Sequence, residues 1–213
     1  MADEKTNKAR AEKHDRILSA AAKIFARKGF FNAKISEIAR EAQVADGTIY
    51  LYFKSKDDIL IHLFEEMMGN ILGALRQEID APGLDSVQRI ERFILFHLHL
   101  VETHPDMAEV ITIELRQSHK FMKEYVPRRF FDYLDAVSNL IIEGQRAGMI
   151  RDDLDPRITR IALFGALDEV SLQWLRANKE QKFSLNEAGR HLSQLFLQGL
   201  QGAPKGAEQR LSG

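Results

Sequence analysis

Residues 35–60 read ISEIAREAQVADGTIYLYFKSKDDIL, and this segment indicates how the N-terminal part of the chain folds. Apolar residues recur at helical spacing over 36–42, a tight turn follows at 43–46, and a second short helix is predicted over 47–53. Two short helices joined by such a turn form a helix-turn-helix, whose second helix is shaped to enter the major groove of DNA. The stretch therefore predicts a DNA-binding unit.

Side chains suited to phosphate contacts crowd the second of these helices. Hydroxyl groups and lysines can pair with phosphate oxygens, and here they belong to Thr48, Tyr50, Tyr52, Lys54 and Lys56. The N-terminus of the following helix also favours an anion. Gly47 allows the backbone to approach DNA closely. The alternative, that both tyrosines are half-buried packing residues, leaves the clustered hydroxyls and lysines unexplained, so we favour DNA recognition.

Charge is distributed unevenly along the chain, although the formal net charge is −1. Residues 1–56 hold 12 Lys/Arg against 7 Asp/Glu, a balance of +5, and the remaining residues hold 18 against 24, a balance of −6. This polarity indicates a basic module that meets a polyanion and an acidic body with another task. A chance excess of solvated lysines would give the same balance, so charge supports the DNA-binding prediction without deciding it.

Helical periodicity runs almost from end to end. A first helix is predicted to end at Gly29, and Ser55 with Asp58 forms a capping pattern that opens a long helix. No stretch alternates with period 2 for long enough to be a strand. The fold class is therefore all-α, with about nine helices. The later ones are predicted over 86–103, 105–119, 121–147, 156–178 and 184–201, with Pro105 and Pro156 in first turns and Ser184 with Glu187 as a second capping box.

Several classes of protein are excluded by what the sequence lacks. The 213 residues contain no Cys, no apolar run of the roughly 20 residues that a membrane span needs, and no apolar segment near the charged N-terminus. We expect a cytoplasmic protein without a membrane partner. Nucleophile-elbow, phosphate-loop, dinucleotide-binding and zinc-protease motifs are also missing, so we predict no catalytic residue and no cofactor. His97 and His99 point to different helix faces, which favours core or pocket histidines over a metal site.

The remainder of the chain carries more apolar surface than a thin helical bundle needs. The segment IERFILFHLHLVE, residues 90–102, is apolar nearly all round and is predicted to be an inner helix. The broad apolar faces within 156–201 predict a homodimer. An elongated apolar cavity and plain core packing both account for the aromatic residues Phe93, Phe96, Phe130, Phe131, Phe164 and Trp174.

The first motif, preceded by ILSAAAKIFARKGF at 17–30, resembles the TetR family of bacterial regulators over residues 14–65. The resemblance implies an N-terminal three-helix DNA-binding domain over residues 1–56. It also implies a helical ligand-binding and dimerisation domain over 57–213, and a homodimer that binds an operator through both subunits. A two-fold dimer pairs with a palindromic operator in double-stranded DNA.

The resemblance also implies roles for individual residues. By position, Ala45, Asp46, Gly47 and Tyr50 would face bases, while Lys34, Ser36, Thr48, Tyr52 and Lys56 would meet phosphates. Two residues depart from the family pattern. Gln43 replaces the usual turn glycine, at a cost of up to about 1 kcal/mol if its backbone is left-handed. Ala45 replaces a frequent capping serine, so we expect Asp46 to cap the recognition helix, which would compromise it as a base reader.

Three segments are similar to a TetR subgroup, the acyl-CoA-responsive repressors of fatty-acid degradation genes: VADGTIYLYFKSKDDILI at 44–61, ELRQS at 114–118 and FGALDE at 164–169. The similarity implies an acyl chain in an apolar tunnel and a CoA headgroup near the surface. The cationic residues of segment 116–129 can meet the CoA phosphates; they are Arg116, Lys120, Lys123, Arg128 and Arg129. The expected ligand-binding residues are Phe93, Phe96, His97, Arg116, Arg128, Arg129, Phe164 and Trp174.

Three alternatives stay open at this point. Glu114 and Arg116 would equally suit an ion-pair network at a helix turn, and Arg128 with Arg129 a solvated corner. A TetR-type regulator of a drug-efflux system would share every DNA-side feature without needing phosphate-binding arginines. An acyl-CoA-processing enzyme would need a nucleophile and base that the sequence does not offer.

Overall fold

The structure, a computed structural model, describes residues 2–201 and forms ten α-helices, one 3-10 helix and no strand within them. This confirms the all-α class. None of the helices in that range is both long and apolar enough to cross a membrane. Two compact units emerge, residues 1–69 with 104–127 and residues 70–103 with 128–213, which we call unit 1 and unit 2. The predicted functional division into 1–56 and 57–213 stays a prediction, and its final residues, 202–213, lie outside the described ones.

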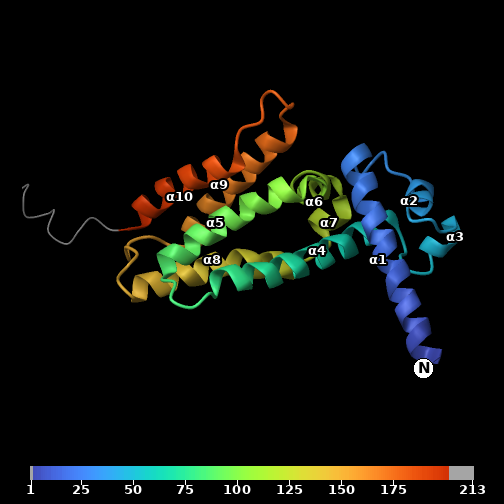
Figure 1. Ribbon diagram of the computed structural model, residues 1–213, viewed down its shortest axis with the longest axis horizontal. Coiled ribbons are helices and arrows are strands. Elements are labelled where there is room, and N and C mark those ends of the chain that lie inside the picture. Colours follow the sequence, from blue (N-terminus) through green and yellow to red (C-terminus); the bar gives the residue numbers. More distant parts are fainter. Residues whose placement is uncertain (1, 202–213) are drawn as a thin grey trace, which may run out of the picture. The chain divides into compact units, whose positions relative to one another are not determined.

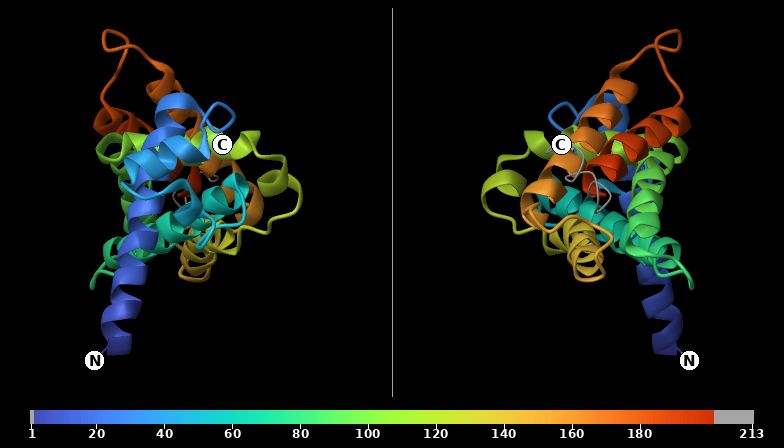
Figure 2. Two further views of the ribbon diagram at one scale, coloured as in Figure 1. Left: turned by 90° about the vertical axis from the view of Figure 1, so that its right-hand side faces the viewer. Right: turned by 90° about the vertical axis from the view of Figure 1, so that its left-hand side faces the viewer.

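Unit 1 contains the predicted helix-turn-helix. Its helices are α1 (Ala2–Lys28), α2 (Ile35–Glu41), α3 (Asp46–Ile49), the first part of α4 (Lys56–Ile79), α6 (Pro105–Thr112), the 3-10 helix η1 (Glu114–Gln117) and α7 (His119–Lys123). Figures 1 and 2 show α2 and α3 beside α1, and α1 also packs against α6.

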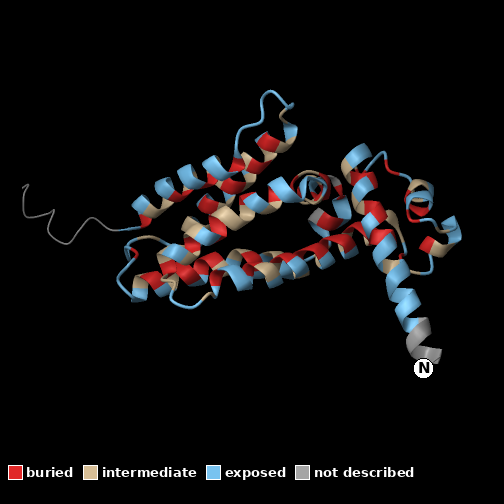
Figure 3. Ribbon diagram, in the orientation of Figure 1, coloured by how far each residue is buried: buried red, intermediate tan, exposed pale blue. Residues whose placement is uncertain are grey.

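The apolar stripes predicted for unit 1 form its core. In α1, Ile17, Ala21 and Phe25 are fully buried, whereas residues 7–13 lie on the surface (Figure 3). α4 contributes a second stripe that begins at Ile59 and Leu60. The predicted cap of α4 is confirmed, because the Ser55 hydroxyl accepts a hydrogen bond of 3.1 Å from the Asp58 amide.

Unit 2 is built around α5 (Ser86–Thr103), whose bounds match the prediction. It packs against α8 (Arg128–Arg146), α9 (Pro156–Arg176) and α10 (Leu185–Leu200), as an inner helix should. One side of α5, at Arg92, His99 and Glu102, nevertheless stays exposed. Asp155 caps α9 and Ser184 caps α10, the second as predicted.

Two long helices predicted from periodicity are wrong. The segment 105–119 leaves the α conformation after Thr112, where the chain turns Glu114 into the core of unit 1. The segment 121–147 is interrupted between α7 and α8 because Pro127 disfavours helical backbone in the residue before it. Apolar spacing continues through both breaks, so periodicity alone did not reveal them.

Candidate functional site

The recognition helix α3 is shorter than predicted, and the chain continues in turns after Ile49. Ile49 and Phe53 are buried and anchor this segment to the domain. The expected base-facing residues lie on the surface, and Tyr50 is 59% exposed. A Cβ added at Gly47 would meet no described atom within 4 Å, so a DNA edge can come close there. The four expected base-facing residues are Ala45, Asp46, Gly47 and Tyr50.

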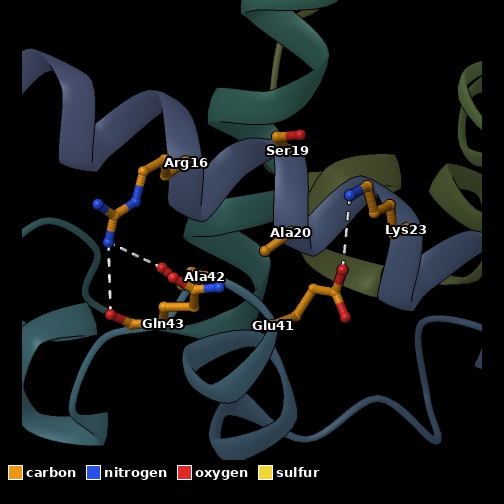
Figure 4. A pocket seen from close by; sticks show the side chains of 7 residues that line it. All are labelled: Arg16, Ser19, Ala20, Lys23, Glu41, Ala42 and Gln43. Atoms are coloured by element: carbon orange, nitrogen blue, oxygen red, sulfur yellow. Dashed lines mark hydrogen bonds and ion pairs between the residues drawn. The ribbon is translucent and has the colours of Figure 1, made fainter.

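Arg16 of α1 fixes the turn between α2 and α3. Its guanidinium donates to the carbonyl oxygens of Ala42 (2.9 Å) and Gln43 (3.4 Å), at the C-terminal end of α2, where a cation is favourable (Figure 4). Gln43 has φ 55, which makes it the single described non-glycine residue in the left-handed region. The condition for the cost of replacing the turn glycine, a left-handed backbone at Gln43, is therefore met. Lys23 and Glu41, 3.5 Å apart, help to line a surface hollow of about 260 Å³ here.

Asp46 does not cap α3, contrary to expectation. The N-cap is Ala45, which offers no side-chain hydrogen bond, and Asp46 occupies the first helical position. Its carboxylate remains on the surface, in the first turn, where a negative charge is favourable. The role of Asp46 as a base reader therefore stays a prediction.

The expected phosphate contacts differ in exposure. Lys34 and Ser36, at the start of α2, are exposed, and Thr48 is half-buried. The Tyr52 ring is also half-buried and lies 5.9 Å from the Arg10 guanidinium. Tyr52 therefore has a packing role, which is compatible with a hydroxyl that reaches a phosphate.

The ammonium group of Lys56 forms its hydrogen bonds within the protein. Its Nζ donates to the carbonyl oxygens of Phe30 (2.6 Å), Phe31 (3.0 Å) and Ala33 (3.1 Å) and lies 4.6 Å from the Phe30 ring centroid. An ammonium group has three protons, so these bonds use every donor. Burial holds the pKa of Lys56 below its ordinary value. Lys56 thus ties down the α1–α2 loop (residues 29–33), which precedes the exposed Lys34.

A buried carboxylate grips the same loop. Glu114 of η1 is 4% exposed and accepts a hydrogen bond from the Phe30 amide. Gly29 has φ +77, a backbone conformation that favours glycine, and a Cβ there would still lie at an ordinary contact distance of 3.5 Å from a Glu114 carboxylate oxygen. Four residues further on, the Ser118 hydroxyl donates to Asp57 at the start of α4 (2.6 Å). The segment 114–118 is therefore bonded on both sides of the exposed Arg116.

In unit 2, three of the expected ligand-binding residues belong to one aromatic cluster. His97 of α5 meets Phe164 of α9 and also lies beside Phe93 of its own helix, with Tyr133 and Phe130 of α8 completing the set; neighbouring ring centroids are 4.9 to 6.5 Å apart. Dehydration lowers the pKa of His97 to about 4, so its imidazole is neutral near pH 7. The Tyr133 hydroxyl lies 2.8 Å from His97 Nδ1, and Ser171 Oγ lies 3.5 Å from Nε2.

The other expected ligand residues lie elsewhere. Phe96 lines a separate hollow of about 410 Å³ beside Leu95 and His99. Trp174 is buried and donates from Nε1 to the Phe183 carbonyl (3.1 Å). Arg116 belongs to unit 1, whereas Arg128 and Arg129 form the exposed first turn of α8 in unit 2.

Comparison with known proteins gives this geometry a context. Residues 17–63 match the bacterial regulatory proteins of the tetR family, and residues 64–199 match the C-terminal region of YsiA-like proteins. The chain belongs to the TetR family. The fatty acid metabolism regulator protein of Bacillus subtilis (strain 168) is 33% identical over 193 residues, which cover 91% of this chain and 98% of that protein.

Two solved TetR structures resemble the chain over nearly its whole length. The fatty acid degradation regulator FadR from Bacillus halodurans is 35% identical, with a TM-score of 0.78 over 88% of this chain and 99% of that one. FadR from Bacillus subtilis, solved in complex with stearoyl-CoA, is 33% identical, with a TM-score of 0.79 over 87% and 98%.

Several residues that support the two units were not predicted from the sequence. Arg16, Asp57 and Tyr133 act through partners that are distant in the chain, and no local pattern marks them. Glu114 carried a partial signal, because a charged residue inside an apolar stretch indicates a buried partner.

Proposed function

We propose that this protein is a transcriptional repressor that binds a palindromic operator as a homodimer and is released by long-chain acyl-CoA, controlling genes of fatty-acid degradation. The observation that carries the proposal is the similarity, over about nine tenths of the chain, to a regulator solved with stearoyl-CoA. We place the protein in the cytoplasm and assign it no catalytic activity, so acyl-CoA should be recovered intact after binding.

The operator side rests on exposed groups of α2 and α3. Asp46, Gly47 and Tyr50 face bases, and Lys34 with Ser36 meets phosphates. Lys56 acts on DNA indirectly, by holding the loop before Lys34.

The effector side combines an apolar and a cationic part. Phe93, His97 and Phe164 lie against the acyl chain. Phe96 and Trp174, which lie apart from this cluster, contact the ligand at other points. Arg116 and the pair Arg128–Arg129 hold the CoA phosphates. A ligand group on Arg116 would act on segment 114–118, whose two ends are bonded to the α1–α2 loop and to α4.

A competition experiment tests the proposal. An operator selected from random duplexes is bound by the protein and then titrated with stearoyl-CoA, stearate and CoA. We expect stearoyl-CoA to weaken operator binding roughly 5- to 150-fold and stearate to act less, because it lacks the phosphates. The effect should shrink in Arg116→Ala and in Arg128→Ala/Arg129→Ala, but not in Arg146→Ala, an exposed control at the other end of α8. Release by a cationic drug and not by stearoyl-CoA would point to an efflux regulator.

A further inference from the structure

Two helices of unit 1 bring together side chains that can bind a metal ion. His14 and Asp15 lie on α1, and Glu66 lies on α4; one potential ligand atom from each lies within 4.8 Å of the other two. His14 Nδ1 and Asp15 Oδ1 are already 3.2 Å apart. Zinc bonds of 2.0–2.1 Å in tetrahedral geometry place neighbouring ligand atoms about 3.3 Å apart, which matches the spacing of this pair once His14 Nδ1 has released the proton that it shares with the carboxylate.

A fourth candidate ligand stands one helical turn before Glu66. His62 and Glu66 are four residues apart on α4, so they share a helix face. The rings of His14 and His62 are 6.3 Å apart and almost perpendicular. His62 Nδ1 lies 2.8 Å from the Asp58 carbonyl oxygen, which can only accept a hydrogen bond, so the proton is on Nδ1. Such a bond leaves the Nε2 lone pair available and is the usual support of a metal-binding histidine.

The surroundings orient the two rings without blocking the carboxylates. The buried Phe53 stacks on His14 at 5.2 Å and meets the edge of His62 at 5.4 Å. Asp15 and Glu66 are exposed, so their side chains can rotate to close the remaining gap. An ordinary His14–Asp15 ion pair accounts for one contact of the group but not for the convergence of ligands from two helices.

We propose that His14, Asp15, His62 and Glu66 form a binding site for a divalent transition-metal ion such as Zn²⁺. Two imidazoles with two carboxylates suit zinc and its first-row neighbours better than Mg²⁺, which prefers oxygen ligands and retains water. The ion links the helices that precede and follow the helix-turn-helix, so it stabilises unit 1. This site is independent of the proposed effector.

The test uses full-length protein without an affinity tag, dialysed against a chelator and then titrated with ZnCl₂ by calorimetry. We expect one ion per chain and, at 100 times Kd, a rise of roughly 5–10 °C in the melting temperature. Co²⁺ in place of Zn²⁺ should give the visible absorption of a four-coordinate site.

Substitutions separate the site from surface binding. His14→Phe keeps the stacking on Phe53 but removes the ligand, and Glu66→Gln keeps the shape. Each should weaken zinc binding at least as much as the 10- to 100-fold loss seen for second-shell changes. His99→Asn, an exposed histidine of α5, is the matched control and should bind normally. Equal affinity in all variants, no stoichiometric binding, or Mg²⁺ binding as tight as Zn²⁺ would each overturn the proposal.

Discussion

At the scale of single residues, two side chains hold states that their type disfavours. Gln43 occupies left-handed backbone in the turn of the helix-turn-helix, where glycine would meet no steric penalty. His97 stays neutral inside the aromatic cluster, although histidine in water gains a proton near pH 6.5. Both states cost free energy, and each gives a measurable prediction.

Gln43→Gly should stabilise the protein by about 0.5–1 kcal/mol, because relief of the left-handed strain exceeds the entropy that glycine adds to the unfolded chain. Denaturant unfolding measures the change. Gln43→Ala keeps a Cβ and serves as the control. If alanine stabilised the protein as much as glycine, the gain would come from loss of the long side chain and not from the backbone.

His97 should make folding weaker in acid. Its pKa is about 4 in the folded state and near 6.5 in the unfolded chain, so only the unfolded chain binds the proton between these values. The stabilisation is complete above pH 6.5 and is lost as pH falls toward 4, by up to about 3 kcal/mol. In His97→Asn, whose side-chain amide can still hydrogen-bond to the Tyr133 hydroxyl, this part of the pH dependence should vanish. His99→Asn should retain it; identical pH profiles for all three proteins would contradict the assignment.

At the scale of elements, the α1–α2 loop is fixed in unit 1 by several side-chain hydrogen bonds. Lys56 binds three of its carbonyl oxygens and Glu114 one of its amides, whereas the neighbouring Lys34 points to solvent. The two lysines should therefore behave differently when they are removed.

Lys34→Ala should leave the melting temperature unchanged and lower the salt slope of operator binding by about one unit, as the loss of one phosphate contact does. Lys56→Met should instead lower the stability by about 1–3 kcal/mol, because three loop carbonyl oxygens, two of them part-buried, lose their donor. Thermal unfolding and binding at several salt concentrations distinguish them. A stable Lys56→Met variant with a reduced slope would restore Lys56 as a direct phosphate contact.

Segment 114–118 should control the response to the effector more than operator affinity itself. Ser118→Ala breaks the bond to Asp57 and weakens the N-terminal cap of α7. The ratio of operator affinities without and with stearoyl-CoA measures the coupling free energy between the two sites. We expect Ser118→Ala to reduce this coupling free energy by about 0.5–2 kcal/mol. Ser36→Ala, an exposed serine of α2, should change operator affinity and leave that ratio intact. An unaltered ratio in Ser118→Ala would show that the segment does not transmit the signal.

At the scale of the whole molecule, α9 and α10 leave apolar side chains uncovered. Ile158, Ile161 and Leu195 are 64%, 59% and 69% exposed, although Leu163 and Leu167 of the same segment are buried. A second copy of the chain would cover such a surface.

Ile161→Asp should therefore give a folded monomer by light scattering, with operator affinity reduced about 100-fold or more, since the second half-site no longer adds avidity. Val126→Asp changes an equally exposed apolar residue outside α9 and α10 and should remain dimeric. Monomeric wild-type protein that binds the operator with full affinity would contradict the dimer.

How far the sequence predicts this molecule depends on the range of the interactions. Local patterns identified the helix-turn-helix and the cap at Ser55, because each depends on neighbours within a few residues. The resemblance marked Gln43 as a turn residue without fixing its backbone conformation. Local patterns did not reveal that Lys56 faces inward, or that α6 ends so that Glu114 can reach Phe30, 84 residues away. Local patterns also did not reveal the proposed metal-binding residues of α1 and α4, since only the packing of the two helices brings them together.

The bond between Phe30 and Glu114 also gives the protein a built-in spectroscopic reporter. Phe30 is 4% exposed, and its amide proton can exchange with solvent only when its hydrogen bond to the Glu114 carboxylate breaks. An amide shared with a carboxylate is strongly deshielded, so in ¹⁵N-labelled protein its resonance should stand apart from the crowded helical signals. Its exchange rate would then time the opening of the α1–α2 loop in solution, in a sample that contains no DNA.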